Sequence, residues 1–125
     1  MRANWDQVRA MALEEVEATL AELPAPLREQ AQALPVTFER FPNRAQRRDG
    51  VAADTLGLFV GAEFAFEETS TLPLPPQIIL FLENIWEVAD AEPGQFREVV
   101  RTTLLHELGH YLGLGEDDLF DRGLE

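Results

Sequence analysis

The sequence predicts an α+β fold in which helices flank a small mixed sheet. Two helix-like segments open the chain, three short strand-like segments follow, and the clearest helix pattern comes after them. Runs of helices followed by runs of strands are typical of α+β domains. With 125 residues, the chain has the length of one compact domain, and we expect residues 1–125 to form a single domain.

Residues 4–22 have the pattern of an amphipathic helix. Apolar side chains recur there at steps of three and four residues. Asn4 can cap the start, with Gln7 three residues further on. Prolines then end this helix, and residues 27–34 favour a second, short helix that stops at Pro35.

Three segments have the composition of strands. Residues 36–41 alternate in polarity, residues 56–61 are apolar, and residues 77–82 are apolar with β-branched side chains. The segment after the first strand, residues 43–50, is expected to be a basic loop. Residues 83–89 favour a helix or a turn.

The clearest helix pattern covers residues 95–112. Its apolar residues follow the 3.6-residue period of an α-helix. We expect Pro93 and Gly94 to break the chain before it. Gly113 and Gly115 are expected to end it, because glycine readily adopts the left-handed conformation found after helices.

The composition excludes several classes of function. The formal net charge is −13, so the chain repels phosphate backbones and nucleic acid is not expected as a partner. There is no cysteine, so nitrogen and oxygen atoms must hold any metal. No apolar run is long enough to cross a bilayer, and the first twenty residues lack the apolar core of a signal peptide. We therefore expect a cytoplasmic protein with no membrane partner.

The strongest chemical signal is the stretch His106-Glu107-Leu108-Gly109-His110, an H-E-x-x-H motif within the predicted helix. Histidines four residues apart differ by about 40° around a helix and by one turn in height, so both rings can reach one ion. Glu107 lies on an adjoining face, where its carboxylate reaches a metal-bound water rather than the metal. Because Zn2+ lowers the pKa of such a water to about 7, Glu107 can act as the general base of a hydrolase.

A third metal ligand is needed, because catalytic zinc sites use three protein ligands and the motif supplies only His106 and His110. Gly113 can end the helix and turn the chain back towards the ion. Glu116 is the first carboxylate after that turn and is the expected third ligand. Asp117 is the alternative, since the sequence does not define the geometry of the turn.

With these residues, the chain resembles the minimal zincin-like metallopeptidases, a family of small, mostly bacterial proteins with the motif H-E-x-x-H-x-x-G-x-x-(D/E). Residues 56–61 are similar to the family's L-G-L-[YF]-x-G strand, and residues 76–81 to its P-x-x-I-x-[LI]-[YF] strand. Residues 101–106 are similar to the helix that leads into the motif. The resemblance covers about residues 50–120, and residues 1–35 more loosely.

The resemblance implies a zinc peptidase in which His106, His110 and the acid at position 116 bind Zn2+ and Glu107 is the base. The family usually has Asp at the third-ligand position, whereas this chain has Glu116 followed by Asp117. The implied fold is a minimal zincin-like domain, with the sheet packed against the motif helix and the N-terminal helices. The implied partner is a peptide or protein substrate. The chain does not fit the metzincins, which have a third His and a downstream methionine turn.

A second hypothesis is a zinc-stabilised binding or adaptor module without catalysis. Glu107 favours the enzyme, because a purely structural metal site does not need a base. The shortness of the chain after the motif favours the module or a restricted activity. An open metal position beside Glu107 would support the enzyme, and a closed site with four ligands would support the module.

Other residues have two interpretations each. Tyr111 is a candidate hydrogen-bond donor to an oxyanion, or a packing residue. Arg44, Arg47 and Arg48 are candidates for clamping a substrate carboxylate, or belong to a solvated loop. Either apolar strand can be an edge strand that pairs with an extended peptide, and an internal strand fits the sequence equally well.

Overall fold

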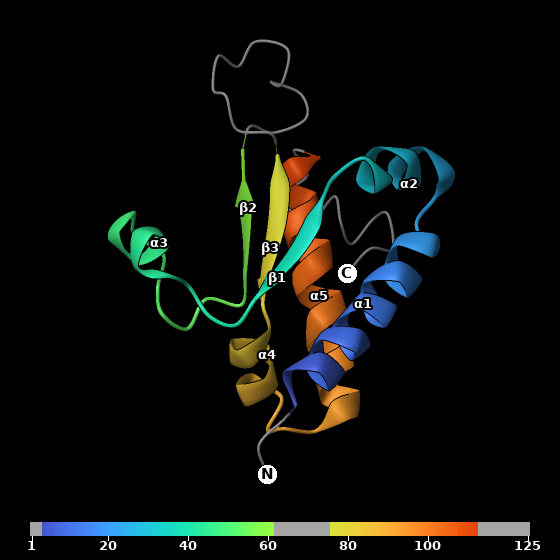
Figure 1. Cartoon of the computed structure of the whole chain (residues 1–125). Coiled ribbons are helices and arrows are strands. Elements are labelled where there is room, and N and C mark those ends of the chain that lie inside the picture. The colour runs from blue at the N-terminus through green and yellow to red at the C-terminus, as the bar shows by residue number, and fades with distance from the viewer. Residues whose placement is uncertain (1–3, 62–75, 113–125) are drawn as a thin grey trace.

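Helices flank a three-stranded mixed sheet in the computed structural model, which describes residues 4–61 and 76–112 (Figure 1). The predicted α+β fold is confirmed. Within these two ranges, no helix combines the length and the hydropathy that a membrane span requires. The elements in chain order are α1 (Trp5–Ala21), α2 (Ala25–Gln32), β1 (Val36–Glu39), α3 (Arg44–Arg48), β2 (Gly57–Val60), β3 (Gln77–Phe81), α4 (Leu82–Val88) and α5 (Pro93–Tyr111).

The central strand of the sheet is β3. Strand β1 pairs with it in parallel, and β2 pairs with its other side in antiparallel orientation. In this register Ile78 lies between Val36 and Phe59, and Leu80 lies opposite Gly57. Of the two apolar strands, β3 is therefore internal, and β2 is an edge strand of the sheet that the described residues form.

One face of the sheet packs into the core against α5. Ile78 and Leu80 are fully buried and belong to the same apolar cluster as Phe96, Val100 and Leu104 of α5. Side chains alternate along a strand and repeat every three to four residues along a helix, so these two apolar surfaces can meet. Full burial of one large apolar side chain contributes about 1.5–3 kcal/mol. This packing fixes the position of α5, and with it the position of the motif.

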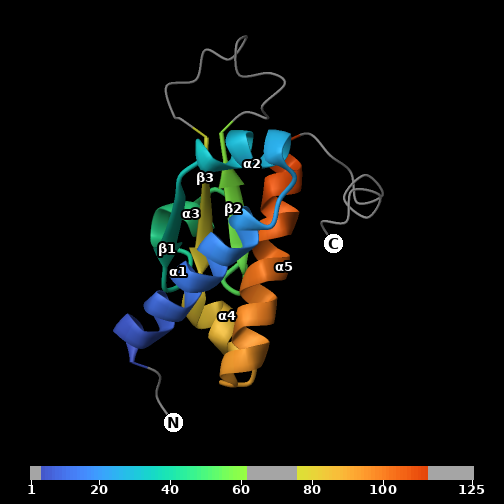
Figure 2. The same ribbon diagram turned by 90° about the vertical axis from the view of Figure 1, so that its right-hand side faces the viewer.

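Helix α1 packs beside α5 (Figures 1 and 2). Its buried apolar stripe repeats every four residues and comprises Val8, Ala12 and Val16. Three ion pairs join α5 to α1 and its C-cap: Arg97 lies 3.3 Å from Glu14 and 3.9 Å from Glu15, and Arg101 lies 2.6 Å from Glu22. Exposed pairs of this kind contribute only about 0–1 kcal/mol each. Apolar burial therefore supplies most of the stability of the α1–α5 contact.

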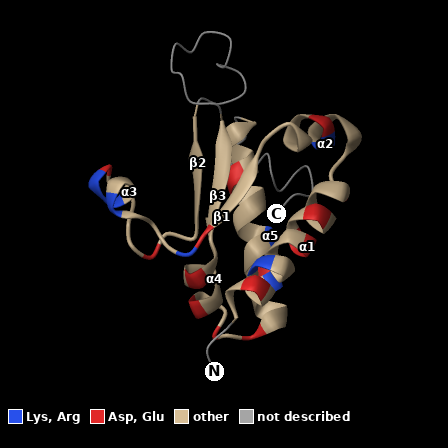
Figure 3. Ribbon diagram, in the orientation of Figure 1, with Lys and Arg blue, Asp and Glu red and all other residues tan. Residues whose placement is uncertain are grey.

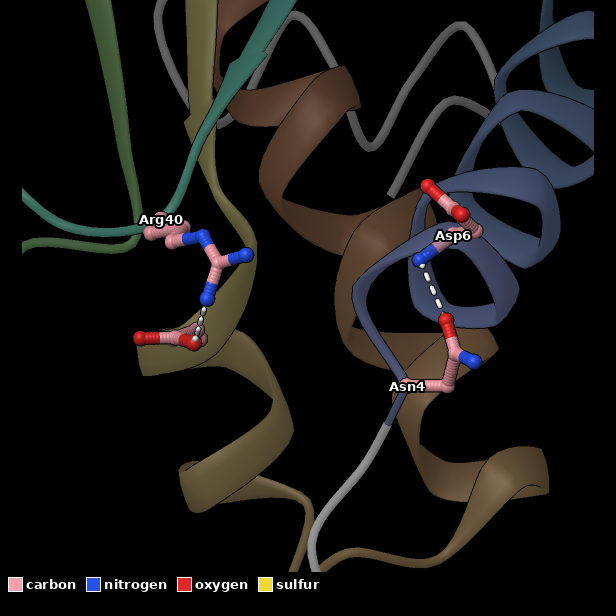
Figure 4. Close-up of polar contacts among 4 residues, drawn as sticks. Asn4, Asp6 and Arg40 are labelled. Atoms are coloured by element: carbon pink, nitrogen blue, oxygen red, sulfur yellow. Dashed lines mark hydrogen bonds and ion pairs between the residues drawn. The ribbon is translucent and has the colours of Figure 1, made fainter.

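Two polar contacts fix the ends of elements (Figure 4). The Asn4 side chain caps α1 as predicted, because its Oδ1 accepts a hydrogen bond from the backbone N–H of Asp6 at 2.8 Å. Arg40, just after β1, donates to Glu83 at 3.1 Å, and its guanidinium lies 4.7 Å from the centre of the Trp5 ring. This one side chain therefore links the end of β1 to the first turns of α4 and α1.

The prediction of a loop over residues 43–50 is wrong, because Arg44–Arg48 form α3. The Asn43 side chain accepts from the backbone N–H of Gln46 at 2.8 Å, and the Gln46 side chain accepts from the backbone N–H of Asn43 at 2.8 Å. This reciprocal arrangement is a capping box. Its signal, Asn followed by Gln three residues later, is visible in the sequence, but the run of basic residues favoured a loop.

Helix α5 starts earlier than predicted. Pro93 does not break the chain before the helix but occupies its first turn, where the missing N–H of proline is not needed. The carboxylate of Glu92 caps this end, accepting from the backbone N–H groups of Gly94 at 3.0 Å and Gln95 at 2.5 Å. A negative charge at this position also interacts favourably with the helix dipole.

The turn between α4 and α5 contains two consecutive left-handed residues that are not glycine. Asp90 has φ 55° and Ala91 has φ 56°. The backbone N–H of Asp90 donates to the carbonyl of Glu87, and that of Ala91 donates to the carbonyl of Trp86, both at 3.0 Å. These two bonds form a Schellman motif, which satisfies the last carbonyls of α4.

Candidate metal centre

The last two turns of α5 carry the residues of the H-E-x-x-H motif. His106 and His110 lie one turn apart on an exposed stripe of the helix. Glu107 points towards the sheet and is only 9% exposed. The structure therefore separates the three side chains as predicted, with two imidazoles open to solvent and the carboxylate on the adjoining, inward face.

The two imidazole rings converge on one point. Their Nε2 atoms are 3.2 Å apart, the ring centres are 4.9 Å apart, and the ring planes meet at 72°. Two nitrogen ligands at 2.0–2.1 Å from a tetrahedral ion are about 3.3–3.4 Å apart. The separation of the two Nε2 atoms therefore fits a shared zinc ion with almost no movement of either side chain.

The Glu107 carboxylate belongs to the same cluster. The ligand atoms of His106, Glu107 and His110 all lie within 4.8 Å of one another. A carboxylate at this distance from the two nitrogens is near enough to contact a water molecule that lies beside both of them. The two imidazole nitrogens suit Zn2+, which binds nitrogen and oxygen ligands, and the Glu107 carboxylate lies beside them.

Gly57 of β2 supports this arrangement, although it was not predicted to be a functional residue. A methyl group at Gly57 would lie 2.6 Å from Cγ2 of Thr103 and 3.3 Å from Cγ of Glu107. The strand can approach α5 this closely because glycine has no side chain. A glycine inside a strand often marks such a close approach, so the signal was present in the sequence.

Tyr111 is a packing residue in this structure. It is 4% exposed, and its ring centre lies 5.7 Å from that of Phe59 on β2. The aromatic contact joins the end of α5 to the edge strand. It therefore helps to hold the end of α5, which carries the two histidines, against β2.

The predicted third ligand lies outside the described residues. This applies to Glu116 and to its alternative Asp117, as well as to Gly113 and Gly115, which are expected to end the helix. Of the four predicted site residues, the structure brings His106, Glu107 and His110 together. The arginines of α3 are not part of this cluster, because α3 lies on the other side of the sheet from α5 (Figures 1 and 2).

Comparison with known families agrees with this geometry. The model of the zincin-like metallopeptidases matches residues 31–124, a range that includes all three strands, the motif and both candidate third ligands. A search of curated proteins finds no significant match. Since the family match covers most of the chain, the chain belongs to the zincin-like metallopeptidase family.

Proposed function

We propose that this protein is a zinc-dependent peptidase that hydrolyses peptide bonds with Glu107 as general base. The observation that carries the proposal is the convergence of the two Nε2 atoms, 3.2 Å apart, beside a largely buried carboxylate. Membership of the zincin-like metallopeptidase family supports the same chemistry.

His106, His110 and Glu116 are the proposed zinc ligands, with Asp117 as the alternative to Glu116. Zinc bound there would supply Lewis acidity to the attacking water and to the peptide carbonyl. The exposure of both imidazoles leaves room for water and substrate at the ion. Among the described residues no fourth ligand closes the cluster, and this favours the enzyme over the zinc-stabilised binding module, since structural zinc sites are closed by four protein ligands.

Glu107 is proposed to act first as a general base and then as a general acid for the same proton. It takes the proton from the attacking water and later gives it to the leaving amine. The side chain is suited to this, because the backbone of Gly57 lies close to its stem while its carboxylate stays near the histidines. A base held in one place loses little entropy at each step.

The outer edge of β2 is the proposed binding place for the substrate backbone. Strand β2 pairs only with β3 in the described part of the sheet, and it contacts α5 along its core side. An extended peptide can add to such an edge through backbone hydrogen bonds. The substrate would then lie beside the strand whose Gly57 contacts Glu107.

Placement in the cytoplasm and the absence of a nucleic-acid partner stay predictions.

The decisive experiment combines metal analysis with cleavage of a peptide library. The wild type is expected to contain stoichiometric zinc and to cleave peptides, and Glu107→Gln to keep the zinc and lose at least a hundredfold in rate, roughly the contribution of a general base. Stoichiometric zinc without cleavage by the wild type would support the binding module instead. Absence of zinc, with no effect of His106→Ala on metal content, would reject both functions.

A separate comparison identifies the third ligand. We expect Glu116→Ala to weaken zinc affinity strongly and Asp117→Ala to leave it nearly unchanged, as measured by competition with a chromogenic chelator. The reverse result would assign Asp117. Equal affinities for both variants and the wild type would remove both carboxylates from the site.

A further inference from the structure

Three arginines of α3 form a basic face beside an exposed aromatic ring. We propose that this surface, which comprises Phe41, Arg44, Arg47 and Arg48 and is called the α3 surface below, docks an acidic peptide segment of a partner protein. The segment would carry at least one apolar side chain among its carboxylates. This interaction is independent of zinc and of peptide hydrolysis.

The geometry of α3 places the three guanidinium groups together. Positions 44, 47 and 48 are related by steps of three and four residues, so they share one face of the helix. All three side chains are exposed. The capping box between Asn43 and Gln46 fixes the start of the helix, and Gln46 also donates to Glu39 at 3.4 Å. The basic face is therefore anchored to the end of β1.

The charges on this face have no acidic partner in the described part of the chain. The ion pairs found there use Arg40, Arg97 and Arg101, and none involves an arginine of α3. This is unexpected, because the chain has 23 acidic residues and 10 basic ones. Figure 3 shows the arginine positions of α3 at one side of the molecule, well separated from those on the other helices.

An apolar side chain adjoins the arginines. Phe41 is 55% exposed, which makes it one of the most exposed large apolar residues of the described chain. It lines an open hollow together with the buried Pro42 and the three arginines. Guanidinium groups bind carboxylates through paired hydrogen bonds, and an aromatic ring offers apolar contact area. The surface thus matches a ligand that is both acidic and partly apolar.

Charge complementarity favours a peptide over the other anionic partners. The net charge of −13 opposes the dense charge of a nucleic acid, whereas a short acidic segment needs only a few carboxylates to pair with three arginines. A second copy of this chain carries the same net charge of −13, so long-range repulsion opposes self-association. A distinct protein with one acidic, partly apolar segment fits best.

The test is a binding titration with the full chain. The probe is a short fluorescein-labelled peptide of Asp and Glu residues around one central Phe, measured by fluorescence anisotropy at low salt. The test variant is Arg44→Gln/Arg47→Gln/Arg48→Gln. The matched control, Arg28→Gln/Arg97→Gln/Arg101→Gln, has the same net charge but an unchanged α3 surface. Circular dichroism melts verify that both variants are folded.

We expect the α3 variant to raise the Kd of the peptide by about tenfold or more relative to the matched control, because charge-assisted hydrogen bonds are lost. Phe41→Ala is expected to weaken binding of the Phe peptide but not of a peptide with Gly in its place. Higher salt should weaken binding of both peptides.

Several outcomes overturn the proposal. One is equal affinity in the α3 variant and its control, and another is no binding at millimolar peptide. Tighter binding of a single-stranded oligonucleotide or of inorganic phosphate would show that the surface selects phosphate. Sedimentation showing that wild type dimerises and the α3 variant does not would assign the surface to a second copy of the chain.

Discussion

At Gly57, the absence of one methyl group determines how closely β2 approaches the motif helix. The methyl group of an alanine would lie 2.6 Å from Cγ2 of Thr103, which is well inside van der Waals contact. Well-packed cores tolerate little added volume, since neighbouring side chains cannot all move away. The two residues therefore limit each other in size.

This mutual limit leads to a stability prediction. We expect Gly57→Ala to lower the free energy of unfolding by about 1–3 kcal/mol through overpacking. Thr103→Ser removes the methyl group that the added side chain would meet, so it should recover much of this loss in the double variant. Urea denaturation of the four proteins gives the coupling energy, expected to be about 1 kcal/mol or more. Strictly additive effects would contradict the contact.

Thr19 is a second residue whose side chain lowers the stability of the fold. It is 1% exposed, and its hydroxyl is a buried polar group of the described chain without a hydrogen-bond partner. A buried unsatisfied polar group costs about 1–3 kcal/mol. Thr19→Val keeps the shape of the side chain and removes the hydroxyl.

We therefore expect Thr19→Val to raise the free energy of unfolding by about 1 kcal/mol, as measured by urea denaturation. The exposed Thr102 on α5 provides the control. Thr102→Val makes the same chemical change in contact with water, and its effect should stay within about 0.5 kcal/mol. A destabilised Thr19→Val variant would mean that the hydroxyl has a partner in solution.

Among the elements, the turn between α4 and α5 combines a stable hydrogen-bond pattern with an unfavourable backbone. A non-glycine residue in the left-handed region costs about 1–2 kcal/mol, and Asp tolerates this region better than Ala. Ala91, with φ 56°, is therefore the more strained of the two residues.

Replacement of this residue tests the strain. We expect Ala91→Gly to raise the midpoint of thermal unfolding, with a gain of about 0.5–1 kcal/mol after the larger entropy loss of glycine. Ala10, exposed in the middle of α1, is the matched control, and Ala10→Gly should cost about 1 kcal/mol. If both substitutions destabilise equally, the turn does not hold Ala91 in the left-handed region.

The elements also show which sequence signals are sufficient to predict a helix. The periodicity of residues 95–112 and the cap at Asn4 predicted α5 and α1, because these signals are local. Helix α3 was missed, because its evidence is a single pair of capping residues. The role of Gly57 follows from a contact with a helix that comes much later in the chain. Such a contact can only be suspected from the glycine itself.

On the scale of the whole molecule, the proposed metal couples the site to the stability of the fold. A ligand that binds only the folded state adds about 2.7 kcal/mol when its free concentration is roughly a hundredfold above Kd. Zinc should therefore raise the midpoint of thermal unfolding of the wild type, and a chelator should reverse this increase.

Two variants separate binding from catalysis in the same melts. His110→Ala removes one of the convergent nitrogens and should abolish the response to zinc. Glu107→Gln should keep it, because Glu107 is proposed as base and not as ligand. An equal zinc response in His110→Ala and the wild type would place the metal elsewhere.

The strand order shows the limit of prediction at this scale. The sequence indicated three strands and an α+β class, but it did not indicate that β3 lies between β1 and β2. The Thr37 hydroxyl donates to the carbonyl of Ile78 at 3.5 Å across a separation of 41 residues. Pairing over such distances depends on how the complete set of elements packs, so the pattern within one segment does not contain it. The third metal ligand lies outside the described residues, so Glu116 and its alternative Asp117 stay predictions.

The position of the central strand has a consequence for synthesis on the ribosome. Strands β1 and β2 are made first, but each pairs with β3, so no part of the described sheet can close before β3 has emerged. Helix α1 can be buried only after α5 has also been synthesised, because α5 covers the apolar stripe of α1. A nascent chain that stops before α5 would expose this stripe to chaperones and proteases. The core is therefore completed at the stage of translation at which the two histidines are synthesised. We expect no folded intermediate that lacks the motif helix to accumulate.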